Sequence, residues 1–435
     1  MRERVKTVFL LLLVAGSMFL TARLLFGQPY LETASPPAYE QLTFGELRPQ
    51  QKQILPHMRL GEKDSYLVLH PWDGGHEAVW ALFLPILRPL EVLDQSEAPE
   101  STEGNHLKLT FSLPIELTLW VNNPRLNGFF ITEINWFVSD PQHLWFKEAN
   151  GEWLRSQQLA VPPDWQQILA ELFANGTKYR GATAQDLATL RLSDNEVLLP
   201  LVTPKLSVYA VEPETVDIEK LQRSIFVNPP LVRRIEERDG AVIYTDGQRG
   251  LRQFAHGELE FTAPENETGT RLFELTEALR QTAQYLQFMG GWPDFIYVDT
   301  IHVSETPTRT KRQWENFELY FLSAQHGAPV VSATPPLSLR FTDRGVFYYN
   351  RQLKILGNRM GIAKSLVPAR TAVRAVIDTL GSTVTVARLV SIYYGYYVDG
   401  TKKEAIAQPS WFITLQDGRT AVVNGYTGQF LSWLA

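Results

Sequence analysis

The sequence predicts an α+β protein with an N-terminal transmembrane helix, a mixed N-terminal domain, and two related units of antiparallel sheet plus helix. An uncharged apolar run occupies residues 7–22, and one order of strands and helix occurs twice after residue 214. The composition, 44% hydrophobic and 20% charged, is typical of a globular protein. A chain of 435 residues is also too long for one ordinary core. We therefore expect several domains.

The apolar run favours a membrane anchor. Residues 5–26 supply about twenty positions, enough for a helix to cross a hydrocarbon core of ~30 Å. Arg2, Arg4 and Lys6 precede the run. By the positive-inside rule, the N-terminus is then cytoplasmic and the later domains are extracytoplasmic. We expect residues 1–27 to form a cytoplasmic stub and a single-pass anchor in the cell membrane.

A cleaved signal peptide is the alternative to this anchor, since it has a similar basic start and apolar run. The exit of the run, residues 20–25, contains no clear pair of small residues for cleavage. A lipoprotein is excluded because the chain has no cysteine to acylate. An uncleaved anchor is the prediction.

One face of the predicted anchor carries small and hydroxyl side chains. Ser17 and Thr21 lie four residues apart, so a helix places them on one face, with Gly16 beside them. Such residues let transmembrane helices approach and hydrogen-bond. Gly16, Ser17 and Thr21 are therefore our hypothesis for a partner-binding face; the alternative is that they only dilute a leucine-rich anchor.

Composition and motifs argue against several function classes. The net charge of −6 gives no reason to expect nucleic acid. The absence of cysteine removes disulfides, thiol catalysis and thiolate metal sites. No nucleophile elbow, His-Glu pair at helical spacing or phosphate loop occurs. We predict no enzyme and no cofactor, although a carboxylate pair for glycoside cleavage stays open because sequence does not place acidic residues in space.

The region after the anchor begins with a proline-marked stalk, residues 28–40. Residues 41–205 form the predicted N-terminal extracytoplasmic domain. Residues 107–121 and 129–140 have strand patterns and are candidate partners. Residues 164–176 begin with a cap-type Asp and end with Gly, which predicts a helix.

The remainder contains a degenerate duplication, residues 214–333 and 337–435. Each copy has strands, then a helix, another strand and a closing strand pair. Apolar residues at steps of three and four predict helices within residues 272–286 and 368–380. The inward faces of the closing hairpins match: Phe317, Leu319 and Phe321 in the first, Trp411, Ile413 and Leu415 in the second.

The last hairpin is predicted to be structural. Residues 411–415 alternate as a half-buried strand does. Asp417-Gly418 follows, a dipeptide that favours a type I′ turn. No residue of the hairpin is a nucleophile with a base beside it.

The stretch from His70 to His76, "HPWDGGH", offers two histidines around Asp73. A metal site is one interpretation, but Pro71 and the Gly-Gly pair indicate a turn, and no third ligand stands at a defined distance. We predict a loop and no metal.

Residues 221–251, "LQRSIFVNPPLVRRIEERDGAVIYTDGQRGL", resemble the YycH family. The family pattern is close to small-Phe-x-Asn/Asp-Pro-x-Leu-Val-Arg, a charged turn, then Tyr-Thr-Asp-Gly and a basic residue. The anchor, the length and the paired C-terminal units fit the same family. The closing hairpin is also similar to the end of a PepSY-type unit, which alone is a weak signal. The matching positions are Phe226, Asn228, Pro229, Leu231, Val232, Arg233, Tyr244, Thr245, Asp246, Gly247 and Arg249.

This resemblance implies a membrane-anchored extracytoplasmic regulator in a Gram-positive bacterium. Its partners would be WalK (YycG), a two-component sensor histidine kinase of cell-wall metabolism, and a YycI-like protein. An alternative from another class is a PepSY-like inhibitor or chaperone of an exported enzyme. A third is a cell-wall hydrolase. The resemblance implies an N-terminal domain followed by two related domains, in agreement with the duplication.

Overall fold

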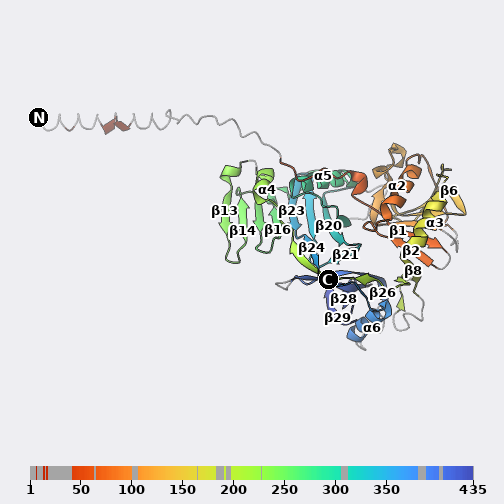
Figure 1. Ribbon diagram of the computed structural model, residues 1–435. Coiled ribbons are helices and arrows are strands. Elements are labelled where there is room, and N and C mark those ends of the chain that lie inside the picture. The colour runs from red at the N-terminus through yellow and green to blue at the C-terminus, as the bar shows by residue number, and fades with distance from the viewer. Residues whose placement is uncertain are drawn as a thin grey trace.

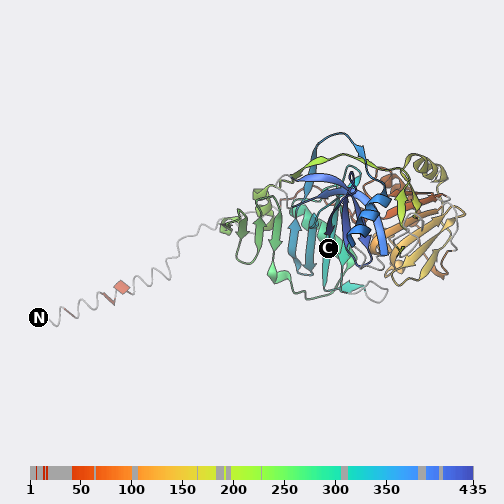
Figure 2. The same ribbon diagram turned by 90° about the horizontal axis from the view of Figure 1, so that it is seen from below.

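The computed structural model arranges the chain in three parts (Figure 1). The N-terminal domain forms one part, a long central sheet the second, and the C-terminal strands with helix α6 the third. Seen from below, the C-terminal part lies across the junction of the other two (Figure 2). The structure describes residues 42–62, 65–99, 106–163, 165–182, 191–192, 197–226, 228–304, 312–380, 388–400 and 405–434, together with Lys6, Leu13, Val14, Gly16 and Ser17.

The N-terminal domain is built on a sheet of nine described strands in the order β10-β8-β2-β1-β4-β5-β6-β7-β3. Helices α2 (His76–Leu87) and α3 (Trp165–Asn175) belong to the same domain. The predicted helix at residues 164–176 is confirmed as α3. The strands are β1 (His57–Glu62), β2 (Ser65–Leu69), β3 (Leu93–Ser96), β4 (His106–Glu116), β5 (Phe130–Phe137), β6 (Asp140–Glu148), β7 (Trp153–Ser156), β8 (Lys178–Gly181) and β10 (Leu198–Pro200).

The two strand patterns predicted at residues 107–121 and 129–140 are confirmed as β4 and β5. They pair antiparallel, with Leu109 opposite Ile134. Both of these side chains are fully buried. Alternation along β4 therefore sets one face of this sheet against the core, as a half-buried strand requires.

The second large sheet contains sixteen described strands and runs through both remaining parts. Its main path is β13-β14-β15-β16-β23-β22-β20-β21-β26-β27-β12-β24, with β18 on β20, β28 and β29 beyond β27, and β9 on β26. The two halves join where β21 runs parallel to β26, with Val330 opposite Tyr396. Strands β11 with β25, and β17 with β19, form two small separate pairs.

The bounds of these elements follow the chain order. Before and within the central part come β9 (Arg191–Leu192), β11 (Lys205–Leu206), β12 (Tyr209–Pro213), α4 (Ile218–Ile225), β13 (Arg233–Glu236), β14 (Val242–Thr245), β15 (Gly250–Gln253), β16 (Leu259–Thr262), β17 (Phe273–Glu274), α5 (Leu275–Phe288), β18 (Ile296–His302), β19 (Gln313–Trp314), β20 (Asn316–Gln325) and β21 (Ala328–Val331). The chain continues with β22 (Leu337–Thr342), β23 (Gly345–Arg351), β24 (Lys354–Arg359), β25 (Lys364–Ser365), α6 (Ala369–Leu380), β26 (Arg388–Val398), β27 (Ile406–Leu415), β28 (Thr420–Asn424) and β29 (Phe430–Leu434).

The predicted α+β class is confirmed, and so are the two helices of the duplicated order, as α5 and α6. In both copies several strands precede the helix, and a strand and a hairpin follow it: β18 and β20–β21 after α5, β26 and β27–β28 after α6. The matched hairpin faces are buried in both copies, with Phe317 and Trp411 each at 0% exposure. Two strands of the second copy, β22 and β23, pair with β20 and β16 of the first. The domain boundaries drawn from the sequence stay a prediction.

The turn predicted after Leu415 is wrong in type. A type I′ turn needs positive φ at both central residues. Gly418 has φ +87°, but the only described non-glycine residue with positive φ is His326. The Gly418 amide donates to the Leu415 carbonyl at 3.0 Å, and the Leu415 amide donates to Arg419. The hairpin is thus a three-residue loop that ends in a left-handed glycine.

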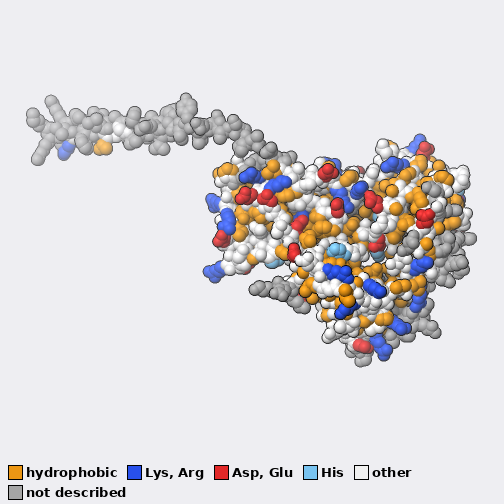
Figure 3. Space-filling model, in the orientation of Figure 1, with side chains coloured by type: hydrophobic (Ala, Val, Ile, Leu, Met, Phe, Trp, Pro, Cys, Tyr) orange, Lys and Arg blue, Asp and Glu red, His pale blue; other side chains and the backbone are white. Residues whose placement is uncertain are grey.

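The predicted anchor falls largely outside the described residues. Gly16 and Ser17 are helical and exposed, whereas Thr21 lies outside the described part. Within the described residues, we find no helix with the length and apolarity that a membrane crossing demands. On the face shown in Figure 3, basic and acidic side chains are interspersed over the described residues.

Candidate functional site

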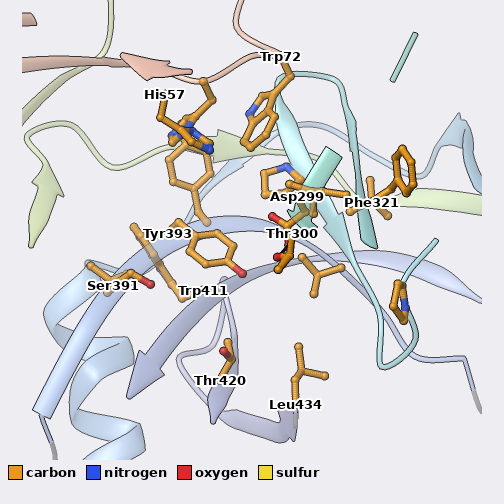
Figure 4. Close-up of a pocket in the computed structure, with 18 of the residues that line it drawn as sticks. His57, Trp72, Asp299, Thr300, Phe321, Ser391, Tyr393, Trp411, Thr420 and Leu434 are labelled. Atoms are coloured by element: carbon orange, nitrogen blue, oxygen red, sulfur yellow. Dashed lines mark hydrogen bonds between the residues drawn. The ribbon is translucent and has the colours of Figure 1, made fainter. Parts of the chain in front are cut away.

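A cavity of about 710 Å³ lies where the three parts of the fold meet (Figure 4). The N-terminal domain supplies side chains from β1, β2 and β8 and from the turn after β2. The central part supplies β18, β20 and β21, and the C-terminal part supplies β26 to β29. The side chains used below are His57, His70, Trp72, Asp73, Tyr179, Asp299, Thr300, Tyr393, Tyr394 and Trp411.

Two histidines and a tryptophan form one wall of this cavity. His57 Nδ1 and His70 Nδ1 are 2.9 Å apart. One of these nitrogens therefore carries a hydrogen and donates, and the other accepts the hydrogen bond. The His70 ring stacks on Trp72, with centroids 4.9 Å apart. Trp72 in turn meets Tyr297 of β18 edge-on at 5.8 Å. These contacts join the N-terminal domain to the central sheet.

Both histidines are held in the neutral form. Burial lowers the pKa of His57 to about 4, with a smaller effect from His76. Burial and the neighbouring His57 and His76 lower the pKa of His70 to about 3. Geometry points the same way, because two imidazolium rings would place two N–H groups against each other at 2.9 Å. At neutral pH this wall carries no positive charge.

Asp73 lies in the turn that connects β2 to helix α2. Its Oδ2 accepts the His70 amide at 2.7 Å, and its own amide donates to the His70 carbonyl at 2.9 Å. These bonds hold residues 70–73 in a tight turn, as Asp does at such positions. Burial raises the Asp73 pKa to about 6, against the opposing effect of the His70 amide. The carboxylate therefore ionises only near neutral pH.

Three tyrosines and a second carboxyl group also line the cavity. Burial raises the pKa of Tyr179, Tyr393 and Tyr394, and Tyr179 also hydrogen-bonds to Tyr394. Asp299 is exposed and lines the cavity. Partial desolvation by neighbouring protein atoms raises its pKa. Thr300 Oγ1 donates to Asp299 Oδ2 at 3.0 Å. The tyrosines are neutral hydrogen-bonding groups at any physiological pH.

The described lining of this cavity contains neither lysine nor arginine. Neither Asp73 nor Asp299 forms an ion pair with a basic side chain in the described part of the chain. The same part contains no group of three or more His, Cys, Asp or Glu side chains arranged to hold a metal ion. The cavity can therefore bind through aromatic faces, neutral hydrogen-bonding groups and two carboxyl groups.

The structure separates the two histidines that the sequence places together. His70 faces the cavity between the three parts. The His76 Nε2 atom hydrogen-bonds to the Pro56 carbonyl at 2.8 Å, and His76 lines a neighbouring cavity of about 630 Å³. The turn between them is as predicted, but helix α2, which begins at His76, was not expected. The apolar residues that follow Gly75 are the sequence feature that could have predicted this helix.

Most of the cavity residues were missed from the sequence because they come from segments far apart in the chain. Asp73 lay in a stretch singled out for its chemistry, but Asp299 and Tyr179 carry no local motif. Strand β26 contributes Tyr393 and Tyr394 to the cavity.

The histidine pair predicts acid sensitivity of the fold. A histidine with a folded pKa near 4 takes up a proton on unfolding between pH 4 and its ordinary value of 6.5, so stability falls as pH drops through that window. Asp73 acts in the opposite direction between pH 6 and 3.8, but one carboxyl opposes two histidines. From pH 7 to 5 we expect a net loss on the order of 1 kcal/mol, allowing for partial exposure. Urea unfolding of His57→Gln should show a smaller loss, and an equal loss in both proteins would contradict this assignment.

Comparison with known proteins gives a fold likeness only. No protein family and no curated protein matches the chain. The crystal structure of YycH from Bacillus subtilis superposes with a TM-score of 0.63 at 13% sequence identity, over 89% of this chain and 100% of that chain. An uncharacterised protein from Eubacterium rectale gives a TM-score of 0.38 at 14% identity, over 55% of this chain and 92% of that one. The C-terminal domain of YpeB from Bacillus megaterium gives 0.29 at 10% identity, over 51% and 97%. The fold is YycH-like, and the two lower scores inform nothing further.

Proposed function

We propose that this protein is a non-catalytic, membrane-anchored regulator of a cell-wall two-component sensor histidine kinase of the WalK (YycG) type. It acts through transmembrane and extracytoplasmic protein contacts, together with a YycI-like partner. The observation that carries the proposal is the YycH-like fold over 89% of the chain. The motif at residues 226–249 supports it independently, because it was found in the sequence alone.

The motif residues have structural roles in the central sheet. Phe226, which follows helix α4, is fully buried. Asp246 Oδ1 accepts the amides of Gln248 and Arg249 at 3.0 and 2.8 Å, which closes the turn between β14 and β15. The Arg249 guanidinium donates to the Ile225 carbonyl at 3.2 Å. The motif residues therefore hold helix α4 against the β14–β15 hairpin. Because the motif has this structural role, a resemblance in its sequence is expected to accompany a likeness in fold.

Regulation through the membrane predicts a role for the anchor. Extracytoplasmic domains do not reach the catalytic parts of a kinase inside the cell, so a signal must pass through helices. We propose that Gly16, Ser17 and Thr21 contact transmembrane helices of the kinase or of the YycI-like protein. Each hydroxyl contact contributes about 0.6 kcal/mol. Removing both then weakens association about eightfold.

The test compares kinase autophosphorylation in membranes that contain the full chain, the Ser17→Leu/Thr21→Leu variant, or a chain that begins at Gln28. A matched control, Met18→Leu/Ala22→Leu, changes two residues at the same spacing on another face. We expect the control to regulate normally and the first variant to require about eightfold more protein. Equal regulation by the chain that begins at Gln28 would exclude the transmembrane route. No effect of the full chain on the kinase would overturn the function itself and favour the inhibitor or chaperone of an exported enzyme.

A further inference from the structure

We propose that the cavity between the three parts binds a small organic cation that carries an ammonium group. The proposal goes beyond kinase regulation, since it assigns a ligand to a site that no comparison identifies. It rests on which side chains line the cavity and on which of them lack a partner of opposite charge.

The first step concerns the two carboxyl groups. Asp73 and Asp299 both face the cavity. Each has a hydrogen-bond donor, the His70 amide or Thr300 Oγ1, but no basic partner among the described residues. Asp73 is half-buried and Asp299 is exposed at the cavity. A cation beside a partly buried carboxylate offsets the cost of removing that carboxylate from water. The cavity therefore supplies two acceptors for positive charge and leaves the cation to the ligand.

The second step concerns the aromatic walls. Trp72 and Tyr179 from the N-terminal domain, and Tyr393 and Tyr394 from β26, line the same cavity as the two carboxyl groups. Figure 4 shows Trp72, Asp299 and Tyr393 around this space. Asp73, Tyr179 and Tyr394 all line this one cavity. Aromatic faces attract ammonium groups, and that attraction is stronger at desolvated sites. Carboxylate and rings thus favour the same ligand group.

The third step excludes other classes of ligand. An anion would meet two carboxyl groups and no lysine or arginine among the described lining residues, and the His57 and His70 rings are neutral at pH 7. A metal ion would need a set of ligands that the described residues do not provide. A neutral sugar could stack on the rings, but it would leave the partly buried Asp73 carboxylate without compensating charge. A cavity of about 710 Å³ also has room for a small molecule of several carbon atoms.

The experiment uses full-length protein in nanodiscs and three five-carbon probes that differ in charge. Cadaverine carries two ammonium groups, 1,5-pentanediol is neutral, and glutarate carries two carboxylates. Isothermal titration calorimetry at pH 7.5 should detect saturable binding of cadaverine alone. Asp73→Asn and Asp299→Asn should each weaken that binding about tenfold or more, the range for a hydrogen bond to a charged group. Asp417→Asn changes an exposed carboxylate in the last hairpin and should leave binding unchanged.

A pH series separates recognition of charge from simple filling of the cavity. Cadaverine should bind less tightly as pH falls below about 6, where Asp73 takes up a proton. The nearby tyrosines, Tyr179, Tyr297 and Tyr394, remain neutral because burial raises each pKa. His57 and His70 stay neutral down to about pH 4 because burial lowers their pKa. Asp299, whose pKa is also raised, adds to the loss of binding at low pH. Binding of the diol as tight as that of cadaverine would overturn the proposal. Undiminished cadaverine binding by both Asn variants would do so too, as would the lack of saturable cadaverine binding at ~1 mM. None of these results would bear on kinase regulation, which the membrane assay measures without the probes.

Discussion

Replacing Arg351 by Met should lower the free energy of unfolding by about 3–5 kcal/mol, the usual result of breaking a buried ion pair. Arg351 is the last residue of β23 and is only 1% exposed. Its Nε and Nη2 atoms donate to the two carboxylate oxygens of Glu214 at 2.7 and 2.8 Å. This bidentate geometry is the strongest form of the pair. The Met variant would leave a largely buried carboxylate without a partner.

The guanidinium of Arg351 also closes the end of helix α5. It donates to the carbonyl oxygens of Gly291 and Gly290 at 2.8 and 3.1 Å. Both glycines have positive φ, so the chain turns sharply where the helix ends. One side chain thus links strand β23, the turn after α5 and the segment after β12. Its loss leaves acceptors in two of these segments, Glu214 and the Gly290-Gly291 turn, unsatisfied.

A second variant distinguishes the ion pair from packing alone. Glu214→Gln combined with Arg351→Met removes the buried charge and should recover part of the lost stability. Urea unfolding followed by circular dichroism measures all three proteins. If the double variant is no more stable than Arg351→Met, the cost comes from the lost carbonyl contacts and not from the unpaired carboxylate. A loss below about 1 kcal/mol in the single variant would contradict the burial of the pair.

The Arg351 cluster illustrates what sequence reasoning could not find. Glu214 and Arg351 are separated by 137 positions, and neither belongs to a motif. The helices α5 and α6 were predictable because apolar residues recur at helical spacing within one short segment. Pairing of β22 with β20, in contrast, depends on the choice of partner between strands of similar composition. Local pattern predicts elements, and long-range partner choice decides how they share a sheet.

The candidate site follows the same rule. The turn at residues 70–76 was predictable from its proline and glycines. Its role was not, because Asp73 shares a cavity with Asp299 and Tyr394 only after three parts of the fold assemble. No local motif in the sequence therefore indicates this cavity, whose lining residues come from all three parts of the fold.

Replacing Trp411 by Ala should lower the stability of the C-terminal part by about 3–5 kcal/mol, the range for truncating a buried aromatic side chain. Trp411 lies in the middle of β27 with 0% exposure. Its neighbours in the sheet are Tyr394 of β26 and Val423 of β28. The Tyr394 ring meets it edge-on at 5.9 Å, a favoured aromatic geometry. Alanine would leave a void between two strands that hold the last hairpin.

The indole also has a polar role that a conservative variant isolates. Trp411 Nε1 donates to the Val367 carbonyl at 3.0 Å, just before helix α6. Trp411→Phe keeps most of the ring volume and loses this bond, so a cost of about 1 kcal/mol is expected. Trp433, which is partly exposed beside Arg419, serves as the control for loss of an indole. Its Ala variant should cost clearly less than Trp411→Ala.

Thermal unfolding followed by circular dichroism, with hydrogen exchange of β27 and β28, measures these effects. Trp411→Ala should lower the transition and speed exchange in both strands, because the void lies between their neighbours. Trp411→Phe should show a small shift, since the core remains filled. An unchanged transition in Trp411→Ala together with lost kinase regulation would mean that the indole faces a partner. That result would contradict its burial and would move the partner surface to the closing hairpin.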